Sequence, residues 1–401
     1  MRTRSLAKIA VVGIAGVLAL SACSNSKTNN GGLAGNSSGG SSAPAGGGTY
    51  TIAFEGPLSG DNQQLGINEV NAAELAIKQA NAKGDLGFTL KLLKADDVGD
   101  PSKAPAAAAQ VLQDNTVMGV IGPSFSGATK AVGQTYGDAG LAMITPSASN
   151  GTLQTLGFKT FHRIIPNDNV EGTQGADWLA RKGLKKVFVV DDQSDYGKGV
   201  ADAVDKELKA KGVAVTRQGV DAKTTDYGAI AQSVKSSGAG ALFYGGYDAQ
   251  AALFAKALKA VNYTGITAGG NGVKSSVFTK GAGAAGNGWY FTCGCLDATI
   301  AANAKQFTTD YTAAYNTPPS TYSPEAFDAT NALIQAIKDA KSKGSVTKAT
   351  VLTAVNAIDY QGITTEVKFG SDGEPAGATT VSLYTQKNGQ IVSVGLLKDQ
   401  N

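Results

Sequence analysis

The stretch that decides the fold is Val117-Met-Gly-Val-Ile121, followed by Gly122-Pro-Ser-Phe-Ser-Gly-Ala-Thr129 and then by Leu141-Ala-Met-Ile-Thr145. Each of the two short apolar runs predicts a buried strand, and the segment between them is long enough for one helix. A strand, a helix and a second strand make up the unit from which parallel sheets with helices on both faces are built. This stretch therefore predicts an α/β protein.

The same alternation continues in both directions along the chain. Further strands are predicted at residues 50–54, 89–93, 160–165, 186–190, 241–244 and 288–291. Residues 68–82 predict a helix, with apolar side chains on one face and Gly84 closing its end. The folded part, about 350 residues from Thr49 onward, exceeds what one core ordinarily holds, so two lobes are expected.

The first residues of the chain predict a secretion signal. Three basic residues, Arg2, Arg4 and Lys8, precede an apolar run at residues 9–20. The run is about a dozen residues long, whereas a helix needs roughly 20 residues to cross a bilayer, so it is typical of a signal-peptide core. Residues 1–22 are therefore expected to be a lipoprotein signal peptide that is removed.

The end of this signal predicts a membrane anchor. Leu20-Ser-Ala-Cys23 resembles the lipobox of bacterial lipoproteins, in which the cysteine becomes the lipid-modified N-terminus. Cys23 is expected to carry a diacylglycerol group and an acyl chain such as palmitate. Residues 23–48, mostly Ser, Gly, Asn and Ala, cannot bury enough apolar area to fold, and we expect them to form a flexible tether.

Composition removes several classes of function. The net charge of +3 comes from 35 basic and 32 acidic residues, and the three basic residues of the signal account for it, so no nucleic-acid partner is expected. His162 is the only histidine, and Cys293 and Cys295 are the only cysteines after Cys23. A histidine-based triad or a zinc site with several His or Cys ligands lacks its residues, and we expect no metal or cofactor. We expect His162 to pack in the fold or to face solvent.

Hydroxyl-rich segments follow several predicted strands. They lie at residues 122–129, 146–149, 191–197 and 245–248. Ligands of open α/β sheets bind at the carboxyl ends of the strands, and free N–H groups at helix starts suit a carboxylate. A serine at a helix start is more often only a cap, but the recurrence of these segments favours a shared pocket.

Taken in order, these segments resemble the periplasmic leucine/isoleucine/valine-binding proteins, the type I solute receptors of branched-chain amino-acid ABC importers. The likeness rests on the order and spacing of residues 52–60, 96–101, 120–126, 143–149, 161–168 and 244–247. It implies the type I periplasmic binding protein fold, with two doubly wound parallel-sheet lobes joined by three crossovers. We expect lobe 1 to comprise residues 49–166 and 297–375, and lobe 2 to comprise residues 167–296 and 376–401.

The resemblance also implies a ligand site. Its expected residues are Ser126, Ser147, Ala148, Ser149, Tyr196, Tyr247, Asn271 and Tyr322. Ser126 and Ser149 would donate hydrogen bonds to the ligand carboxylate, and the Ser147 carbonyl would accept one from its ammonium. The tyrosines would supply aromatic contacts from lobe 2 and from the pocket wall.

Three departures from the family pattern limit what the resemblance implies. Leu65 stands where an aromatic residue often lies, and Val98 and Phe125 replace cysteines that some members join. Asn271 stands where amino-acid receptors commonly carry a carboxylate for the ligand's ammonium. Charged hydrogen bonds are roughly twice as strong as neutral ones. An amide, a urea-like compound or another small polar solute therefore remains open as the ligand.

An amino-acid ligand would need another carboxylate, because an unpaired buried charge is costly. Asp168 and Asp248 are the residues that we expect to replace it. The exported compartment permits disulfides, and we expect a local bridge between Cys293 and Cys295 at the second crossover, two free thiols being the alternative.

The function expected from the sequence is capture of a small solute, most simply a branched-chain or related amino acid, for the permease of an ABC importer. No covalent chemistry is expected. Two alternatives stay open: a lipid-anchored enzyme using carboxylates such as Asp96, Asp97 or Asp191, and a sensory receptor that reports to a kinase.

Overall fold

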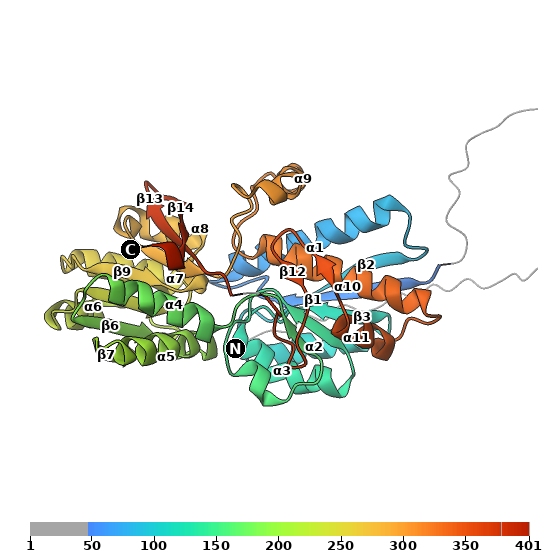
Figure 1. Ribbon diagram of the computed structural model, residues 1–401, viewed down its shortest axis with the longest axis horizontal. Helices are drawn as coiled ribbons and strands as arrows, with labels where there is room; N and C mark the ends of the chain where they lie inside the picture. Colours follow the sequence, from blue (N-terminus) through green and yellow to red (C-terminus); the bar gives the residue numbers. More distant parts are fainter. Residues whose placement is uncertain (1–46, 378, 401) are drawn as a thin grey trace, which may run out of the picture. The chain divides into compact units, whose positions relative to one another are not determined.

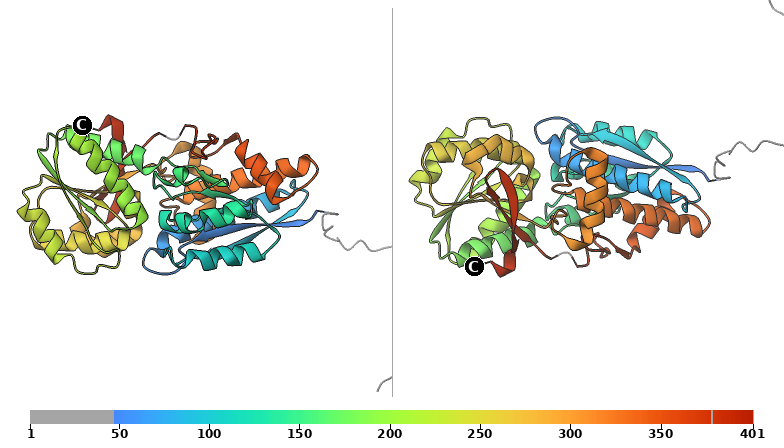
Figure 2. Two further views of the ribbon diagram at one scale, coloured as in Figure 1. Left: turned by 90° about the horizontal axis from the view of Figure 1, so that it is seen from below. Right: turned by 90° about the horizontal axis from the view of Figure 1, so that it is seen from above.

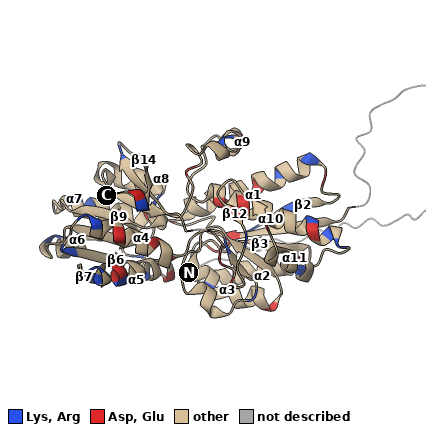
Figure 3. Ribbon diagram, viewed as in Figure 1, with Lys and Arg blue, Asp and Glu red and all other residues tan. Residues whose placement is uncertain are grey.

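The computed structural model describes residues 47–377 and 379–400. The predicted signal peptide, the predicted lipidation site Cys23 and the tether up to residue 46 lie outside the described residues. No helix of the described part is long and apolar enough to cross a membrane. Lys, Arg, Asp and Glu are scattered over the helices and loops of this part (Figure 3).

One group of strands forms a five-stranded, fully parallel sheet in the order β2-β1-β3-β4-β5 (Figure 1). Its strands are β1 (Thr49–Gly56), β2 (Thr89–Asp96), β3 (Val117–Ile121), β4 (Ala142–Thr145) and β5 (Phe161–Arg163). Helices α1 (Gln63–Lys83), α2 (Ala104–Gln113), α3 (Ser126–Asp138), α10 (Ser323–Ser342) and α11 (Lys348–Asn356) pack on it. We call this sheet with its helices lobe 1.

Alternation along β1 distributes these helices over the two faces of the sheet. Ile52 and Phe54 pack in one core cluster with α1, α10 and α11, whereas Ala53 packs in another with α2 and α3. Successive side chains of a strand point to opposite faces, so a continuous apolar run is what a sheet covered on both sides requires. Helices cover both faces of each sheet in Figure 2.

The second sheet has seven strands in the order β14-β13-β10-β9-β8-β6-β7. They are β6 (Lys186–Asp191), β7 (Ala214–Gly219), β8 (Ala241–Gly245), β9 (Ile266–Gly269), β10 (Tyr290–Cys293), β13 (Ser382–Lys387) and β14 (Gln390–Leu396). Helices α4 (Asp168–Arg181) and α5 (Asp195–Ala210) cover one face, and α6 (Gly228–Ser236), α7 (Asp248–Ala260) and α8 (Ser276–Ala282) the other. We call this sheet with its helices lobe 2.

The predicted two-lobe α/β fold is confirmed, with one addition in lobe 2. β13 runs antiparallel to β10, and β14 runs antiparallel to β13, so the sheet is parallel only from β10 to β7. An antiparallel strand at the edge of an otherwise parallel sheet is common in doubly wound folds.

The remaining described elements are short or lie outside the two large sheets. They are α9 (Lys305–Tyr315), the pair β11 (Tyr360–Gln361) and β12 (Glu366–Val367), and the 3₁₀ turns η1 (Leu153–Leu156), η2 (Asn271–Val273), η3 (Gly283–Gly286), η4 (Ala302–Ala304) and η5 (Leu397–Asp399). α9 packs against α1 through its own small apolar cluster.

The chain passes between the lobes at points that lie close together. Gly294, after β10, approaches Pro166, after β5, so closely that an added Cβ would lie 2.6 Å from the Pro166 Cδ. The Tyr384 hydroxyl of β13 donates to the Cys295 carbonyl at 2.8 Å. In the structure Cys293 and Cys295 are joined by a disulfide at this place.

Candidate ligand-binding site

Two loops of lobe 1 are tied together at the carboxyl ends of β3 and β4. The Ser147 hydroxyl donates to the Ser124 carbonyl at 2.7 Å, and the Asn150 backbone N–H donates to the Ser126 hydroxyl at 3.1 Å. The Ala148 N–H donates to Thr145 Oγ1 at 2.9 Å. These bonds place Ser126, the first residue of α3, next to the loop that carries Ser147 and Ser149, as expected for neighbouring parallel strands.

A buried arginine, Arg163, fixes the position of loop 146–150. Arg163 in β5 is fully buried, and its Nη1 donates to the carbonyls of Ala148 and Asn150 at 2.9 and 3.0 Å. Its Nε donates to Glu374 at 3.1 Å, and Nη2 pairs with the same carboxylate. The guanidinium fork thus sets the position of loop 146–150 with two bonds to its main chain.

Lobe 2 contributes the facing side of the site. Tyr196, the second residue of α5, accepts a hydrogen bond from the Gly272 N–H at 3.0 Å. The Tyr247 ring precedes α7 and stacks on the Phe125 ring of lobe 1, with centroids 4.3 Å apart. Tyr322 belongs to lobe 1, where it is the residue before α10, and its φ of 69° is an uncommon conformation for a residue other than glycine.

Several bonds join the two lobes directly. Asn62 Nδ2 donates to Asp248 Oδ1 at 2.6 Å, and the Lys130 ammonium pairs with Asp195 at 2.7 Å. Together with the stacked ring pair, these contacts hold the lobes against each other over the site.

The cavity enclosed between the lobes is small, about 10 Å³, which is the space of a single water molecule. Its walls are formed by Leu65, Ser124, Phe125, Ser126, Ser147, Tyr196, Tyr247, Asn271, Gly272 and Tyr322. The structure therefore brings most of the expected site residues together. Ala148 and Ser149 are buried just behind this wall, where the Ser149 hydroxyl lies 3.5 Å from Asn271 Nδ2.

Two buried acids behind the wall were not found from the sequence. Glu69 on α1 accepts from the Ser124 hydroxyl at 2.5 Å, and Glu171 on α4 accepts from Asn271 Nδ2 at 2.6 Å. Burial raises the pKa of Glu69 to about 8 and that of Glu171 to about 7. Neither residue lies in a motif or next to a predicted strand end, so the sequence offered no signal for them.

The cavity is not lined by Asp168 or Asp248, the two residues that we expected to supply the carboxylate that Asn271 lacks. Asp248 is bound to the Asn62 amide and to the Ser275 hydroxyl. Asp168 is fully buried at the start of α4, and burial raises its pKa to about 8.

The acids considered for an enzyme are held in turns or in an ion pair. Asp96 accepts from the Leu58 and Val98 N–H groups at 2.9 and 2.8 Å, and Asp97 accepts from the Gly99 N–H at 2.8 Å. Asp191, in lobe 2, pairs with Arg217 at 3.0 Å. These carboxylates stabilise turns or pair with a neighbouring arginine.

His162 packs inside lobe 1. Its Nε2 lies 2.7 Å from the Asn356 amide oxygen, and its ring contacts the Phe369 ring. Burial lowers its pKa, which favours the neutral ring. In residues 47–377 and 379–400, no group of three or more His, Cys, Asp or Glu side chains could hold a metal ion.

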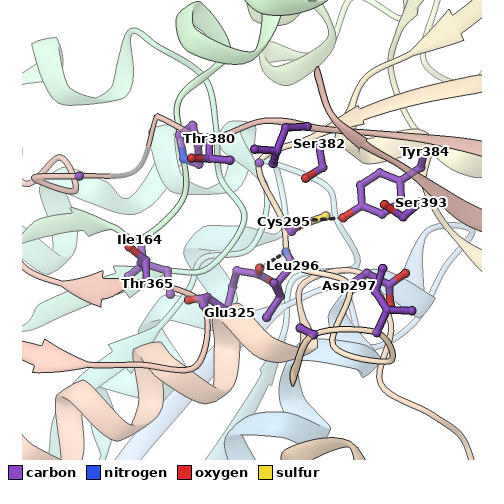
Figure 4. Close-up of a pocket in the computed structure, with 17 residues that line it drawn as sticks. Ile164, Cys295, Leu296, Asp297, Glu325, Thr365, Thr380, Ser382, Tyr384 and Ser393 are labelled. Atoms are coloured by element: carbon purple, nitrogen blue, oxygen red, sulfur yellow. Dashed lines mark hydrogen bonds between the residues drawn. The ribbon is translucent and has the colours of Figure 1, made fainter. Parts of the chain in front are cut away.

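A larger cavity, of about 360 Å³, lies where the chain crosses between the lobes (Figure 4). Glu325, Asp297, Ser382 and Tyr384 are among the residues that line it. It shares no wall residue with the cavity between the serines and tyrosines. It is not the site that the sequence predicts.

Comparison with known proteins agrees with this geometry. A family model described as "Periplasmic binding protein" matches residues 49–390. The Leu/Ile/Val-binding protein BraC3 of Rhizobium johnstonii is 30% identical over 356 residues, which are 88% of this chain and 95% of that protein.

Solved structures are similar over nearly the whole described part. The branched-chain amino acid transporter substrate binding protein LivJ of Streptococcus pneumoniae, in complex with isoleucine, has a TM-score of 0.79 and 26% identity, covering 87% of this chain and 99% of that one. A solute binding protein of R. palustris in complex with benzoate has a TM-score of 0.78 at 20% identity, covering 87% and 96%. This second likeness shows the fold alone, so the fold does not decide the ligand.

Proposed function

Because this chain belongs to the periplasmic binding protein family, we propose that it is an exported receptor that captures a small amino acid between its two lobes for an ABC importer. The observation that carries the proposal is the cavity wall, to which lobe 1 contributes Ser126 and Ser147 and lobe 2 contributes Tyr196 and Tyr247. Neutral donors at the start of a helix suit a carboxylate, and aromatic rings suit an aliphatic side chain.

Binding would proceed by closure of the lobes. We take residues 49–166 with 297–375 and residues 167–296 with 376–401 as the two moving bodies. The cavity has room for about one water molecule, so an amino acid can enter only when the lobes separate. A ligand that contacts both lobes stabilises the closed state by contacts that the open state lacks. The permease would then recognise the closed pair of lobe surfaces, and no covalent step is required.

A thermal-shift screen tests this proposal. We expect branched-chain and related small amino acids to stabilise the protein, because a ligand that binds only the folded state adds about 2.7 kcal/mol at 100 times its Kd. The screen should include amides, urea-like compounds and aromatic acids such as benzoate. Stabilisation by these compounds alone would replace the amino acid as the ligand, and turnover of any of them would point to an enzyme.

We also propose that the mature protein is anchored to the outer face of the cell membrane through Cys23, with residues 23–48 as a tether. The lipobox and the composition of the tether support this proposal. Replacing Cys23 with Ala is expected to leave the precursor unprocessed at this position and to remove the lipid. Fractionation and mass spectrometry of the N-terminus measure both effects. Equal processing and equal lipid content of the two proteins would refute the anchor.

A further inference from the structure

Glu171 is a buried carboxyl group next to the candidate site. Its side chain is fully buried in lobe 2, and Oε1 accepts from the Asn271 backbone N–H at 2.9 Å and from the Thr292 hydroxyl at 2.7 Å. Oε2 accepts from Asn271 Nδ2 at 2.6 Å. All three donors are neutral, and Glu171 takes part in no ion pair among the described residues. A buried carboxylate without a cation is costly, so this group takes up a proton or needs a positive charge nearby.

Asn271 connects this carboxyl group to the cavity. It lines the cavity between the lobes, and its Nδ2 is held by Glu171. Holding the amide nitrogen leaves the amide oxygen as the acceptor that Asn271 can offer to a ligand. Hydrogen bonds in a chain polarise one another, so a carboxylate behind the amide makes this oxygen a stronger acceptor.

We infer that Glu171, acting through Asn271, supplies the negative charge that balances an ammonium group of the ligand. The inference rests on the proposed function and deepens it, because it names the source of the negative charge that would make the site prefer an ammonium group to the hydroxyl of a hydroxy acid of the same shape. It replaces Asp168 and Asp248 as the source of the charge. Glu171 is a positioning residue here, since Asn271 lies between it and the cavity.

Each element packed against Glu171 presents acidic or neutral groups to it. Asp168 lies one turn earlier on α4, Tyr196 faces it from α5, and Tyr322 faces it from the start of α10. Burial together with this carboxylate raises the pKa of both tyrosines, so they stay protonated. Glu69 adds a further buried acid on the lobe 1 side of Tyr322.

This setting predicts how affinity depends on pH. Burial raises the pKa of Glu171 to about 7, against the lowering effect of its hydrogen bonds. An ammonium group nearby would lower the pKa again, so binding releases a proton when Glu171 starts protonated. Affinity for an amine should therefore fall roughly tenfold per pH unit below about pH 7 and level off above it.

The experiment compares L-leucine with L-2-hydroxy-4-methylpentanoate, which has a hydroxyl in place of the ammonium. Calorimetry in two buffers of different ionisation enthalpy gives both the Kd and the number of protons released. We expect the intact protein to prefer leucine by roughly ten- to a hundredfold and to release a proton near pH 7. In Glu171→Gln, the ratio of the two Kd values should move toward one, and fewer protons should be released on binding.

Glu325→Gln is the matched control. Glu325 is also buried, burial also raises its pKa to about 7, and its Oε1 accepts from the Leu296 N–H at 2.7 Å. It lies at the larger cavity of the crossovers, so both the preference and the proton release should survive its replacement.

The outcomes separate this inference from the proposed function. If leucine binds and Glu171→Gln keeps both the preference and the proton release, the role of Glu171 is wrong while the receptor function stands. If Glu171→Gln does not fold, measurements on the intact protein test the inference. Equal affinity for leucine and the hydroxy acid, or leucine binding without proton release, overturns it. If no amino acid binds, both the function and this inference fail.

Discussion

Removing either hydroxyl, in Ser126→Ala or Ser149→Ala, is expected to weaken binding of the amino acid ten- to a hundredfold. A hydrogen bond to a charged group contributes about 1.5 to 3 kcal/mol, which corresponds to that change in Kd. Ser126 lines the cavity at the start of α3, and Ser149 is buried beside Asn271. Calorimetry with the amino acid that the thermal-shift screen selects measures the effect.

Thr347→Ala is the control for loss of a hydroxyl at a helix start. Thr347 forms a capping box with Thr350 on α11, outside the cavity wall. Loss of such a cap costs about 0.5 to 2 kcal/mol of stability, and we expect no change in Kd. Unchanged affinity in both serine variants would mean that the ligand binds elsewhere.

Arg163→Met is expected to lower the free energy of unfolding by about 3 to 5 kcal/mol. Arg163 is fully buried and its partner Glu374 is only 17% exposed, so removing the arginine leaves a mostly buried carboxylate without its cation. The variant also leaves the carbonyls of Ala148 and Asn150 without the donors that hold loop 146–150. Because this loop carries Ser147 and Ser149, ligand affinity should fall as well.

Urea denaturation of Arg163→Met and of Lys368→Met measures this difference. Lys368 is exposed and pairs with Asp359 at 2.7 Å, a kind of pair that contributes little. We expect the stability of Lys368→Met to stay close to that of the intact protein. A loss below 1 kcal/mol in Arg163→Met would show that the buried pair does not support the loop.

The elements with continuous apolar runs were predictable from the sequence. β3 begins and ends at the residues of the predicted run, and β1, β2, β6 and β8 extend their predicted runs by one to three residues. Such runs are a strong signal because both faces of the strand are buried. α1 begins five residues before the predicted helix, since polar residues at its start hid the first turn.

Four strands of lobe 2 were not predicted, namely β7, β9, β13 and β14. The first two were missed for a physical reason. β7 carries Thr216, Arg217 and Gln218, lies at the edge of the sheet and is mostly half-buried or exposed. β9 has only four residues, Ile266–Gly269, and two of them are only partly buried. Edge position and short length remove the apolar pattern on which a sequence-based prediction depends.

The site was predictable where it follows strand ends, and not where it depends on distant contacts. Ser126, Ser147, Tyr196 and Tyr247 follow predicted strands or lie in quoted motifs, and the fold brings them to one cavity. Glu171 meets Asn271 across 100 residues of sequence, a contact that no local pattern indicates. The carboxyl group of Glu171 beside the Asn271 amide could therefore be found only from the structure.

A crystal structure of the protein with the selected amino acid tests the central claim most directly. The account predicts one ligand between the lobes, its carboxylate on Ser126 and Ser149 and its side chain against Tyr196 and Tyr247. A ligand bound instead in the larger cavity beside Glu325, or on one lobe alone, would contradict it.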